Sequence, residues 1–408
     1  MSWPTLRFEQ LYAEPSRNGV YKPTQFHGPG VRIVNMGELF AFDIISNQEM
    51  NRLAMNDAEM AKSGLRDGDL LFGRRSLVEA GAGKCSLVEG LSEPTTFESS
   101  IIRVRVDENR LKPRFIYYWL KSHSGRGAIR AIVTGTNVKG IRSSVLKDIE
   151  VPCPTTETQD RIVERLRAYD NLIENNRRRI QLLEQAARLL YKEWFVHLRF
   201  PGHEHAKIKD GVPEGWEKKH LAELMDTQYG FTETATAEPV GPQFLRGTDI
   251  NKTSYIDWSN VPYCPDDKLD YNKYALKIND IVVIRMADPG KVAIVESEVK
   301  AIFASYLVRL IRKNGVTVPP LYLFYVLSDD GYQGFISGAC GGATRKSANA
   351  KLLVDFNVVI PPATLVSMFI AQVEALRSQI QTLLKQNSCL VKARDLLLPR
   401  IMNGVIAV

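Results

Sequence analysis

The sequence predicts an α+β protein made of two copies of one unit, each a globular module followed by a long helix. A heptad series begins at Ile162, and a second one begins 207 residues later at Phe369. The segments before these helices match each other in the same order, with offsets that stay within seven residues of 207. One similar segment could arise by chance, whereas an ordered series of them indicates an internal duplication.

The composition is that of an ordinary soluble globular protein with two or three domains. The chain has 408 residues, of which 44% are hydrophobic and 24% charged, with a net charge of +7. This basic balance is compatible with an anionic partner. We find no signal peptide and no run of about eighteen apolar residues, so we expect a cytoplasmic protein without a membrane partner. We expect reduced, buried thiols and neither a disulfide framework nor a zinc site, since these cysteines are dispersed: Cys85, Cys153, Cys264, Cys340 and Cys389.

The two heptad series alternate steps of four and three, which is typical of a helical seam. The first predicted seam contains Ile162, Leu166, Tyr169, Ile173, Asn176, Ile180, Leu183 and Leu190. The second contains Phe369, Val373, Leu376, Ile380, Leu383, Asn387, Leu390 and Leu397. Each seam holds one asparagine, but Asn176 aligns with Leu383 and not with Asn387. A polar seam residue can specify register, so we expect these helices to pack on each other; a core helix in a bundle is the alternative.

Proline-marked segments precede both helices, at Val151 and at Val359, and suit helix starts. We expect Pro399 to mark the limit of the last turn and Gly404 to cap it. Each module alternates short β-like runs with turn signals and holds one amphipathic helix, near residues 113–123 and 320–328. The expected domains are a first module at 1–153, a helix at 154–198, a linker at 199–213, a second module at 214–360 and a helix at 361–408.

Catalytic interpretations find little support. The segment NVPY at Asn260 resembles the NPPY motif of adenine methyltransferases, but Val261 replaces a proline and no glycine-rich loop follows a strand. Asp288 with Glu298 and Lys300 has the outline of a metal-dependent nuclease site, yet the first copy has no counterpart. We therefore expect a protein without catalytic or metal-binding residues of its own.

Binding remains, through polar loops that recur in both modules. From Ile101 to Lys147 there are eleven lysines and arginines against two acids. Arginine and lysine neutralise phosphates, and together with asparagine they pair with base edges; ordinary surface cations are the alternative. The candidate DNA-binding residues are Arg32, Asn35, Arg74, Arg75, Lys84, Asn137, Lys139 and Arg142 in the first module, and Arg246, Asp249, Arg285, Lys291, Thr344, Arg345 and Lys346 in the second.

The order of these landmarks resembles the specificity subunit of Type I restriction–modification systems over essentially the whole chain. The resemblance rests on the duplicated design, on the segments LRDGDLL and LKINDIV before a glycine-lysine turn, on the prolines that precede each helix, and on the leucine-rich helix ends. The glutamine usual at the start of the helix fits Gln159, whereas the second copy has Val366.

The resemblance implies two target recognition domains, each reading half of a split, asymmetric site in double-stranded DNA. It also implies that the two helices lie antiparallel, hold the modules apart as a spacer and dock two methyltransferase subunits, and through them restriction subunits. S-adenosylmethionine would then belong to the methyltransferase partner, and this subunit would hold no cofactor. The alternatives are a tandem protein-interaction scaffold that does not read DNA, and a single-chain methyltransferase or nuclease.

Overall fold

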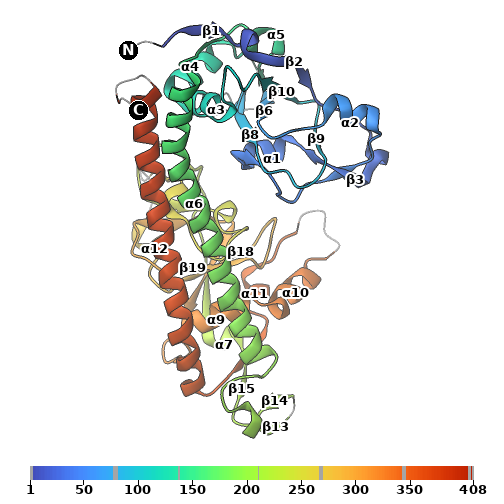
Figure 1. Cartoon of the computed structure of the whole chain (residues 1–408). Coiled ribbons are helices and arrows are strands. Elements are labelled where there is room, and N and C mark those ends of the chain that lie inside the picture. The colour runs from blue at the N-terminus through green and yellow to red at the C-terminus, as the bar shows by residue number, and fades with distance from the viewer. Residues whose placement is uncertain are drawn as a thin grey trace. The chain divides into compact units, whose positions relative to one another are not determined.

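The computed structural model describes residues 3–76, 81–136, 138–209, 211–265, 270–341, 346–402 and 406 (Figure 1). It divides into two compact units. Unit 1 consists of Met1–Ile173 with Cys389–Val408, and unit 2 of Glu174–Ser388. Each unit therefore contains one module and parts of both long helices, α6 (Thr156–Tyr191) and α12 (Ala363–Met402). Within the described residues, no helix is both long and apolar enough to cross a membrane.

The module of unit 1 is built on a five-stranded sheet in the order β2-β10-β6-β8-β4, in which only the β4–β8 pair is parallel. The central strand β6 is buried along its whole length, which explains its uninterrupted apolar sequence LLFG. The strands are β2 (Tyr12–Asn18), β4 (Ile44–Ile45), β6 (Leu70–Gly73), β8 (Cys85–Val88) and β10 (Ile101–Val106). A second sheet has the order β5-β3-β9, from Arg52–Leu53, His27–Val34 and Thr95–Phe97.

Unit 2 repeats this arrangement with a four-stranded antiparallel sheet in the order β16-β21-β18-β19. Its strands are β16 (Met225–Tyr229), β18 (Ile281–Ile284), β19 (Val292–Ile294) and β21 (Leu307–Arg312). The parallel pair β17 (Gln243–Leu245) and β20 (Ala301–Phe303) corresponds to β3 and β9. In each module the first strand pairs with the last strand, which directly precedes the long helix. These pairs are β1 (Thr5–Arg7) with β12 (Glu150–Pro152), and β15 (Glu217–His220) with β22 (Asn357–Ile360).

Each module contains two consecutive helices where the sequence led us to expect one. In unit 1, α3 (Pro113–Lys121) is followed by α4 (His123–Ala131), and in unit 2, α9 (Pro320–Ser328) is followed by α10 (Asp330–Ala339). The break is a new N-cap, because Ser122 Oγ accepts a hydrogen bond from the Gly125 amide at 3.2 Å, and Asp329 accepts one from Gly331 at 3.3 Å. The shorter elements of the modules are α1 (Met36–Ala41), α2 (Asp57–Ser63), α5 (Ser143–Leu146), α7 (Leu221–Leu224), α8 (Tyr271–Tyr274) and α11 (Ala350–Leu353).

A repeated turn explains the segments LRDGD and LKIND. Gly68 and Asn279 both have a left-handed backbone, with φ of 90° and 72°, a region that glycine and asparagine tolerate best. The aspartate that follows closes each turn: Asp69 accepts from the Arg66 amide at 2.8 Å, and Asp280 accepts from the Lys277 amide at 2.9 Å. The turn thus needs these residue types to lead the chain into the central strand.

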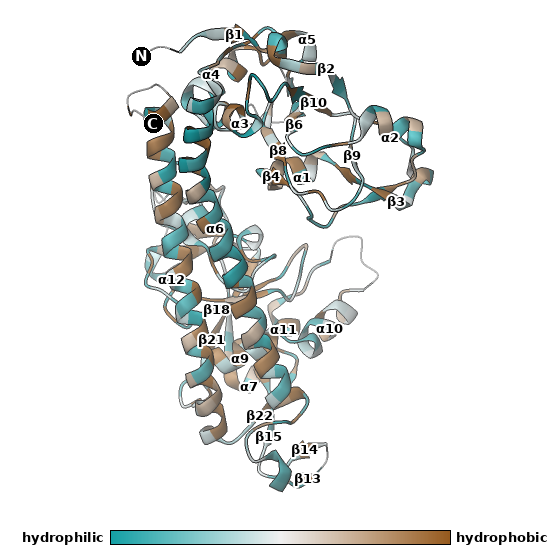
Figure 2. Ribbon diagram, in the orientation of Figure 1, coloured by the Kyte–Doolittle hydropathy of each residue, from teal (hydrophilic) through white to brown (hydrophobic). Residues whose placement is uncertain are grey.

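The two long helices run antiparallel within each unit, as the resemblance implied. In unit 1, Asp170 of α6 pairs with Arg394 of α12 at 2.8 Å, and Ile162 shares a core cluster with Ile401. In unit 2, Ile180 packs with Ile380 and Leu383. All sixteen predicted seam residues are buried or partly buried. Figure 2 shows apolar and polar segments alternating along both helices.

Three details differ from the expectations. Pro399 does not mark the helix limit, since it lies inside α12, which continues to Met402; Gly404 is outside the described residues. Cys85, Cys264 and Cys340 are buried, but Cys389 is exposed and Cys153 only partly covered. The expected linker holds a 3-10 turn at His203–His205 and a short hairpin of β13 (Ile208–Lys209) with β14 (Val212–Pro213).

Candidate nucleic-acid interface

Arg74 follows the central strand β6 of unit 1, and its backbone is held by hydrogen bonds with two other segments. We call this arrangement the clasp. The Arg74 amide donates to Ser100 at 2.9 Å, and its carbonyl accepts from the Ile141 amide at 3.0 Å. Immediately beyond, β7 (Arg75–Ser76) pairs with β11 (Lys139–Gly140). Arg142 then precedes α5 and is exposed. This clasp brings four predicted residues, Arg74, Arg75, Lys139 and Arg142, to one end of the sheet.

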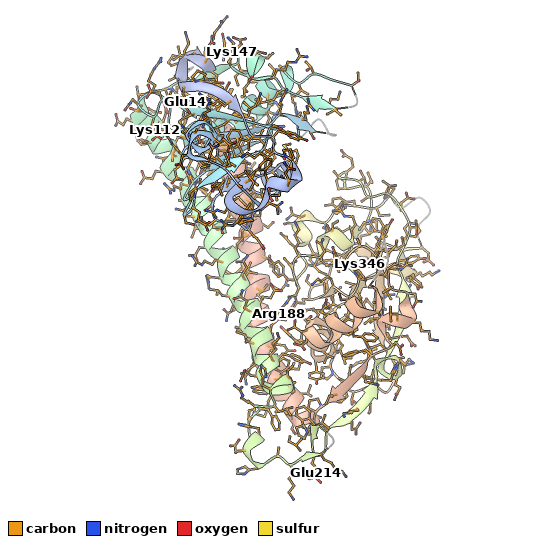
Figure 3. All side chains as sticks on the ribbon, turned by 90° about the vertical axis from the view of Figure 1, so that its right-hand side faces the viewer. Glu14, Lys112, Lys147, Arg188, Glu214 and Lys346 are labelled. Atoms are coloured by element: carbon orange, nitrogen blue, oxygen red, sulfur yellow. The ribbon has the colours of Figure 1, made fainter. Side chains whose placement is uncertain are left out.

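Unit 2 repeats the clasp at Arg285. The Arg285 amide donates to Tyr306 at 2.9 Å, and its carbonyl accepts from the Ala348 amide at 2.8 Å. The Ala287 amide donates to the carbonyl of Lys346 at 3.1 Å, which places this lysine beside the clasp (Lys346 is labelled in Figure 3). The two copies therefore use one backbone design to present an arginine and a loop cation together.

A glycine in each module makes the clasp possible. Gly83 and Gly290 have φ of 66° and 95°, and a Cβ at either site would lie 2.5 Å from Ile129 or 3.1 Å from Ile336. Their amides bond back to the end of the central strand, to Gly73 at 2.8 Å and to Ile284 at 2.9 Å. The glycine-lysine turn of the sequence thus lets the helix α4 or α10 pack directly against the strand end.

The surface of unit 1 around this clasp is strongly basic. In the described part of the chain, no carboxylate forms an ion pair with Arg74, Arg75, Lys139 or Arg142. Helix α4 adds Arg126, which donates to the Gly83 carbonyl at 3.3 Å, and its neighbour Arg130. Burial, and then the charge of Arg130, lower the pKa of Arg126 from its ordinary value.

Arg126 and Arg130 were not among the residues predicted from the sequence. The available signal was the absence of any acid between residues 109 and 147. This stretch does not show which of its cations lie beside the clasp, because the sequence predicted no helix beyond residue 123. Together with Arg74, Arg75, Lys139 and Arg142, they form what we call the unit 1 basic patch.

The equivalent surface of unit 2 is polar and aromatic. The Arg285 guanidinium lies 4.9 Å from the centre of the Tyr229 ring and donates to the Ser305 carbonyl at 3.4 Å. Tyr229 and Tyr306 are 44% and 56% exposed, so both rings are accessible at this surface. Gln333 and Ser337 lie on α10 at the positions that Arg126 and Arg130 occupy on α4. Lys291 and Lys346 are exposed, so among the described residues this surface carries fewer cations than the one in unit 1.

Several candidate residues are engaged within the fold instead. Arg32 is 4% exposed and bonds Asn47 at 3.1 Å, so it does not reach the surface. Asn35 caps α1 in a capping box with Glu38. Lys84 donates to the Phe40 carbonyl at 2.5 Å, and burial lowers its pKa.

The second module shows the same use of polar side chains for structure. Arg246 and Asp249 pair with each other at 2.8 Å across one 3-10 turn, so their charges cancel locally. Sequence patterns could not separate these structural roles from contacts with a ligand, because both use the same residue types. Asn137, Thr344 and Arg345 lie outside the described residues.

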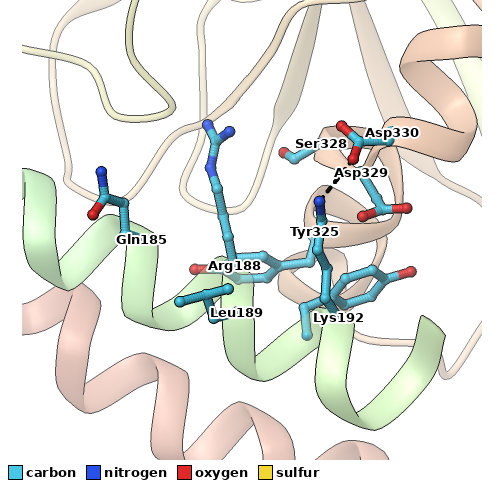
Figure 4. A pocket seen from close by; sticks show the side chains of 9 residues that line it. Gln185, Arg188, Leu189, Lys192, Tyr325, Ser328, Asp329 and Asp330 are labelled. Atoms are coloured by element: carbon cyan, nitrogen blue, oxygen red, sulfur yellow. Dashed lines mark hydrogen bonds and ion pairs between the residues drawn. The ribbon is translucent and has the colours of Figure 1, made fainter. Parts of the chain in front are cut away.

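The two catalytic candidates of the sequence make local contacts within the fold. Asp288 accepts a hydrogen bond from Asn251 at 3.2 Å, and no three His, Cys, Asp or Glu side chains of the described residues gather as metal ligands. Asn260 of the NVPY segment bonds Asp257 at 2.8 Å in a 3-10 turn. The groove drawn in Figure 4, of about 280 Å³, lies between α6 and the α9–α10 turn, next to the ion pair of Lys192 and Asp330 at 2.7 Å. It is separate from the clasp residues.

These features are those of a duplicated scaffold with one cationic clasp per module. Residues 45–185 and 213–372 both match the family of the Type I restriction modification DNA specificity domain. The two matches cover more than half of the chain, which therefore belongs to this family. Its members are specificity subunits, the non-catalytic components of restriction–modification complexes, and the role of the family is DNA recognition.

Similar proteins cover most of the chain. The Type I restriction enzyme MjaIX specificity subunit of Methanocaldococcus jannaschii is 22% identical over 394 residues, 89% of this chain and 85% of that protein. The EcoBI specificity subunit of Escherichia coli is 23% identical over 324 residues, 75% of this chain and 67% of that protein. The crystal structure of a Type I S subunit from M. genitalium shares the fold, with a TM-score of 0.53 at 16% identity over 98% of this chain and 96% of that one.

Proposed function

We propose that each module reads one half of a bipartite, asymmetric site in double-stranded DNA through its clasp. The repeated backbone clasp around Arg74 and Arg285 supports this proposal most directly. The surroundings of the clasp differ between the two copies. Where unit 1 has its basic patch, unit 2 has the exposed Tyr229 and Tyr306 beside Arg285. Two surfaces of one design but unlike chemistry suit two different half-sites.

The two clasps call for different DNA contacts. A group of lysine and arginine side chains suits phosphates, which position a protein on DNA without reading its sequence. An arginine held against an aromatic ring and a carbonyl is restricted in its rotamers, which suits a guanine edge in the major groove. We therefore assign mainly phosphate contacts to Arg130 and base reading to Arg285.

The test uses the chain assembled with its methyltransferase partner and sequences selected from a random duplex pool. Arg285→Ala should weaken binding to the selected site by about 1–3 kcal/mol and relax specificity at one position. Arg130→Ala should weaken binding to all sequences alike and reduce the salt slope by about one. The matched control is Arg66→Ala, an exposed arginine at the opposite end of β6. No sequence-selected binding by the assembled wild type would refute the proposal.

We also propose that two copies of a methyltransferase subunit dock on the long helices. Leu182 and Leu189 of α6 are 58% and 61% exposed, and Leu396 of α12 is 68% exposed. Positions 182 and 189 correspond to 389 and 396 at the offset of 207, and both copies carry an alanine between them. An exposed apolar stripe at heptad spacing, present once per repeat, suits one helical partner in two identical copies. S-adenosylmethionine would bind to that partner.

Stoichiometry tests this docking. Leu189→Glu and Leu396→Glu should each remove one of two bound methyltransferase subunits, and the double variant should remove both, as measured by native mass spectrometry. Leu172→Glu is the control, because Leu172 is 51% exposed on α6 but corresponds to the polar Gln379 in the other copy. Retention of both partners by the double variant would contradict the proposed surface, and would leave DNA reading by the modules untouched.

A further inference from the structure

The contact between a module and its long helix contains two residues that both copies share. Glu89 and Glu296 follow equivalent strands, and Tyr118 and Tyr325 lie in equivalent helices, each pair 207 residues apart. Both glutamates lie in the junction of their own unit, where they need a positively charged partner. The two copies supply that partner from different places.

In unit 1 the partner comes from the module. Arg114 of α3 donates to Glu89 at 2.8 Å and approaches Asp170 of α6 at 3.6 Å. Tyr118 donates its hydroxyl to Asp170 at 2.5 Å, and Arg394 of α12 pairs with the same carboxylate at 2.8 Å. Arg114 and Arg394 thus serve Glu89 and Asp170 in this junction, and Arg394 also pairs with the exposed Asp395 at 2.9 Å.

In unit 2 the partner comes from the long helix. At the offset of 207, Leu321 of α9 is equivalent to Arg114. Arg377 of α12 is equivalent to Asp170, and Ala187 of α6 is equivalent to Arg394. Arg377 pairs with Glu296 through two hydrogen bonds, one of them 2.7 Å long, and its side chain is only 4% exposed. Burial opposes its charge, but Glu296 holds the pKa of Arg377 above its ordinary value.

We propose that these two residue sets, Arg114–Asp170–Arg394 and Leu321–Arg377–Ala187, are keys that restrict each module to the long-helix segments of its own unit. If the unit 1 module packed against the helix residues of the unit 2 key, Arg377 and Ala187, then Glu89 would face both Arg114 and Arg377. With the unit 2 module on the unit 1 key, Glu296 would join Asp170 with Arg394 as the sole guanidinium. A buried charge without its partner is strongly destabilising, so both exchanged pairings would be selected against.

The keys therefore restrict which module sequence can fold stably at each of the two places in the chain. Under the proposed function, they also decide in which order the two half-sites of an asymmetric DNA site are read. Only this last consequence rests on the proposed function, since the keys themselves act on folding.

The experiment converts the first key into the second within the full chain and measures the melting temperature without DNA. Asp170→Arg alone adds a third arginine beside Arg114 and Arg394, and Arg114→Leu alone leaves Glu89 without its partner. The triple variant Arg114→Leu/Asp170→Arg/Arg394→Ala reproduces the unit 2 set. The control exchanges an exposed pair on α6, Glu174→Arg with Arg177→Leu, whose side chains are 74% and 65% exposed.

Each single variant should lower the melting temperature by at least about 5 °C. The triple variant should return to within about 2 °C of wild type, and the control should change little. If a single variant does not fold, recovery of soluble chain by the triple variant gives the same answer. A triple variant no more stable than the single ones, or single variants as stable as wild type, would overturn the proposal.

Discussion

The asparagines of the two seams, which do not align in the repeat, meet in the folded protein. Asn176 Nδ2 donates to Asn387 Oδ1 at 3.0 Å, and Asn176 is 7% exposed. Under the repeat symmetry, this pair corresponds to Leu383 with Ile180, which form an apolar contact. One step of the coiled coil is therefore polar while its symmetric counterpart is apolar.

Replacing one asparagine should cost more than replacing both. Asn387→Leu leaves the buried Asn176 amide without this partner, which should lower the free energy of unfolding by about 1–2 kcal/mol. That corresponds to a decrease of roughly 2–8 °C in melting temperature. The double variant Asn176→Leu/Asn387→Leu replaces the pair with an apolar contact and should lie within about 1 kcal/mol of wild type.

Thermal unfolding followed by circular dichroism measures this difference. We expect the double variant to be more stable than the Asn387→Leu variant. A double variant less stable than either single one would refute it, because the asparagines would then contribute net stability and not register.

Three further predictions concern the fold around the site. Gln159 is fully buried and makes three hydrogen bonds of 2.7–3.0 Å with Lys112, Arg110 and Pro154. The Gln159→Ala variant should therefore lower the free energy of unfolding by about 2–4 kcal/mol. The control variant Glu157→Ala, on the exposed side of the helix, should leave it unchanged. Gly83→Ala should be more destabilising than Gly202→Ala by about 1–3 kcal/mol, because both have positive φ but only the first would clash with α4; equal melting temperatures would contradict the packing described. Cys389 should react with a thiol reagent at pH 8 while Cys85 does not, since burial raises the pKa of the Cys85 thiol well above its ordinary value and keeps it protonated; labelling of Cys85 in the native protein would show that this core opens.

Gln159 and Val366 occupy equivalent positions at the start of the two long helices, but they stabilise these helices in different ways. The equivalent Val366 makes no such hydrogen bonds and is 3% exposed in the apolar core of unit 2. One copy thus anchors the start of its helix by polar contacts and the other by apolar packing. The sequence showed the difference, but only the neighbours of each side chain explain it.

The duplication, the two modules, the two long helices and their seams all follow from the order of residues along the chain. These features depend on spacing and on apolar periodicity, which are properties of the chain read in order. The same holds for the turn before each central strand, because a left-handed backbone requires glycine or asparagine there.

The tertiary structure decided which polar residues are available to a partner. Arg32, Lys84 and Asp249 bond within the fold, whereas Arg126 and Arg130 join the unit 1 basic patch from a helix that the sequence had not predicted. It also decided that the two asparagines meet and that each module carries a different charge set against its helix. The role of a polar side chain depends on its neighbours in the folded protein, and in this chain those neighbours are distant in the sequence.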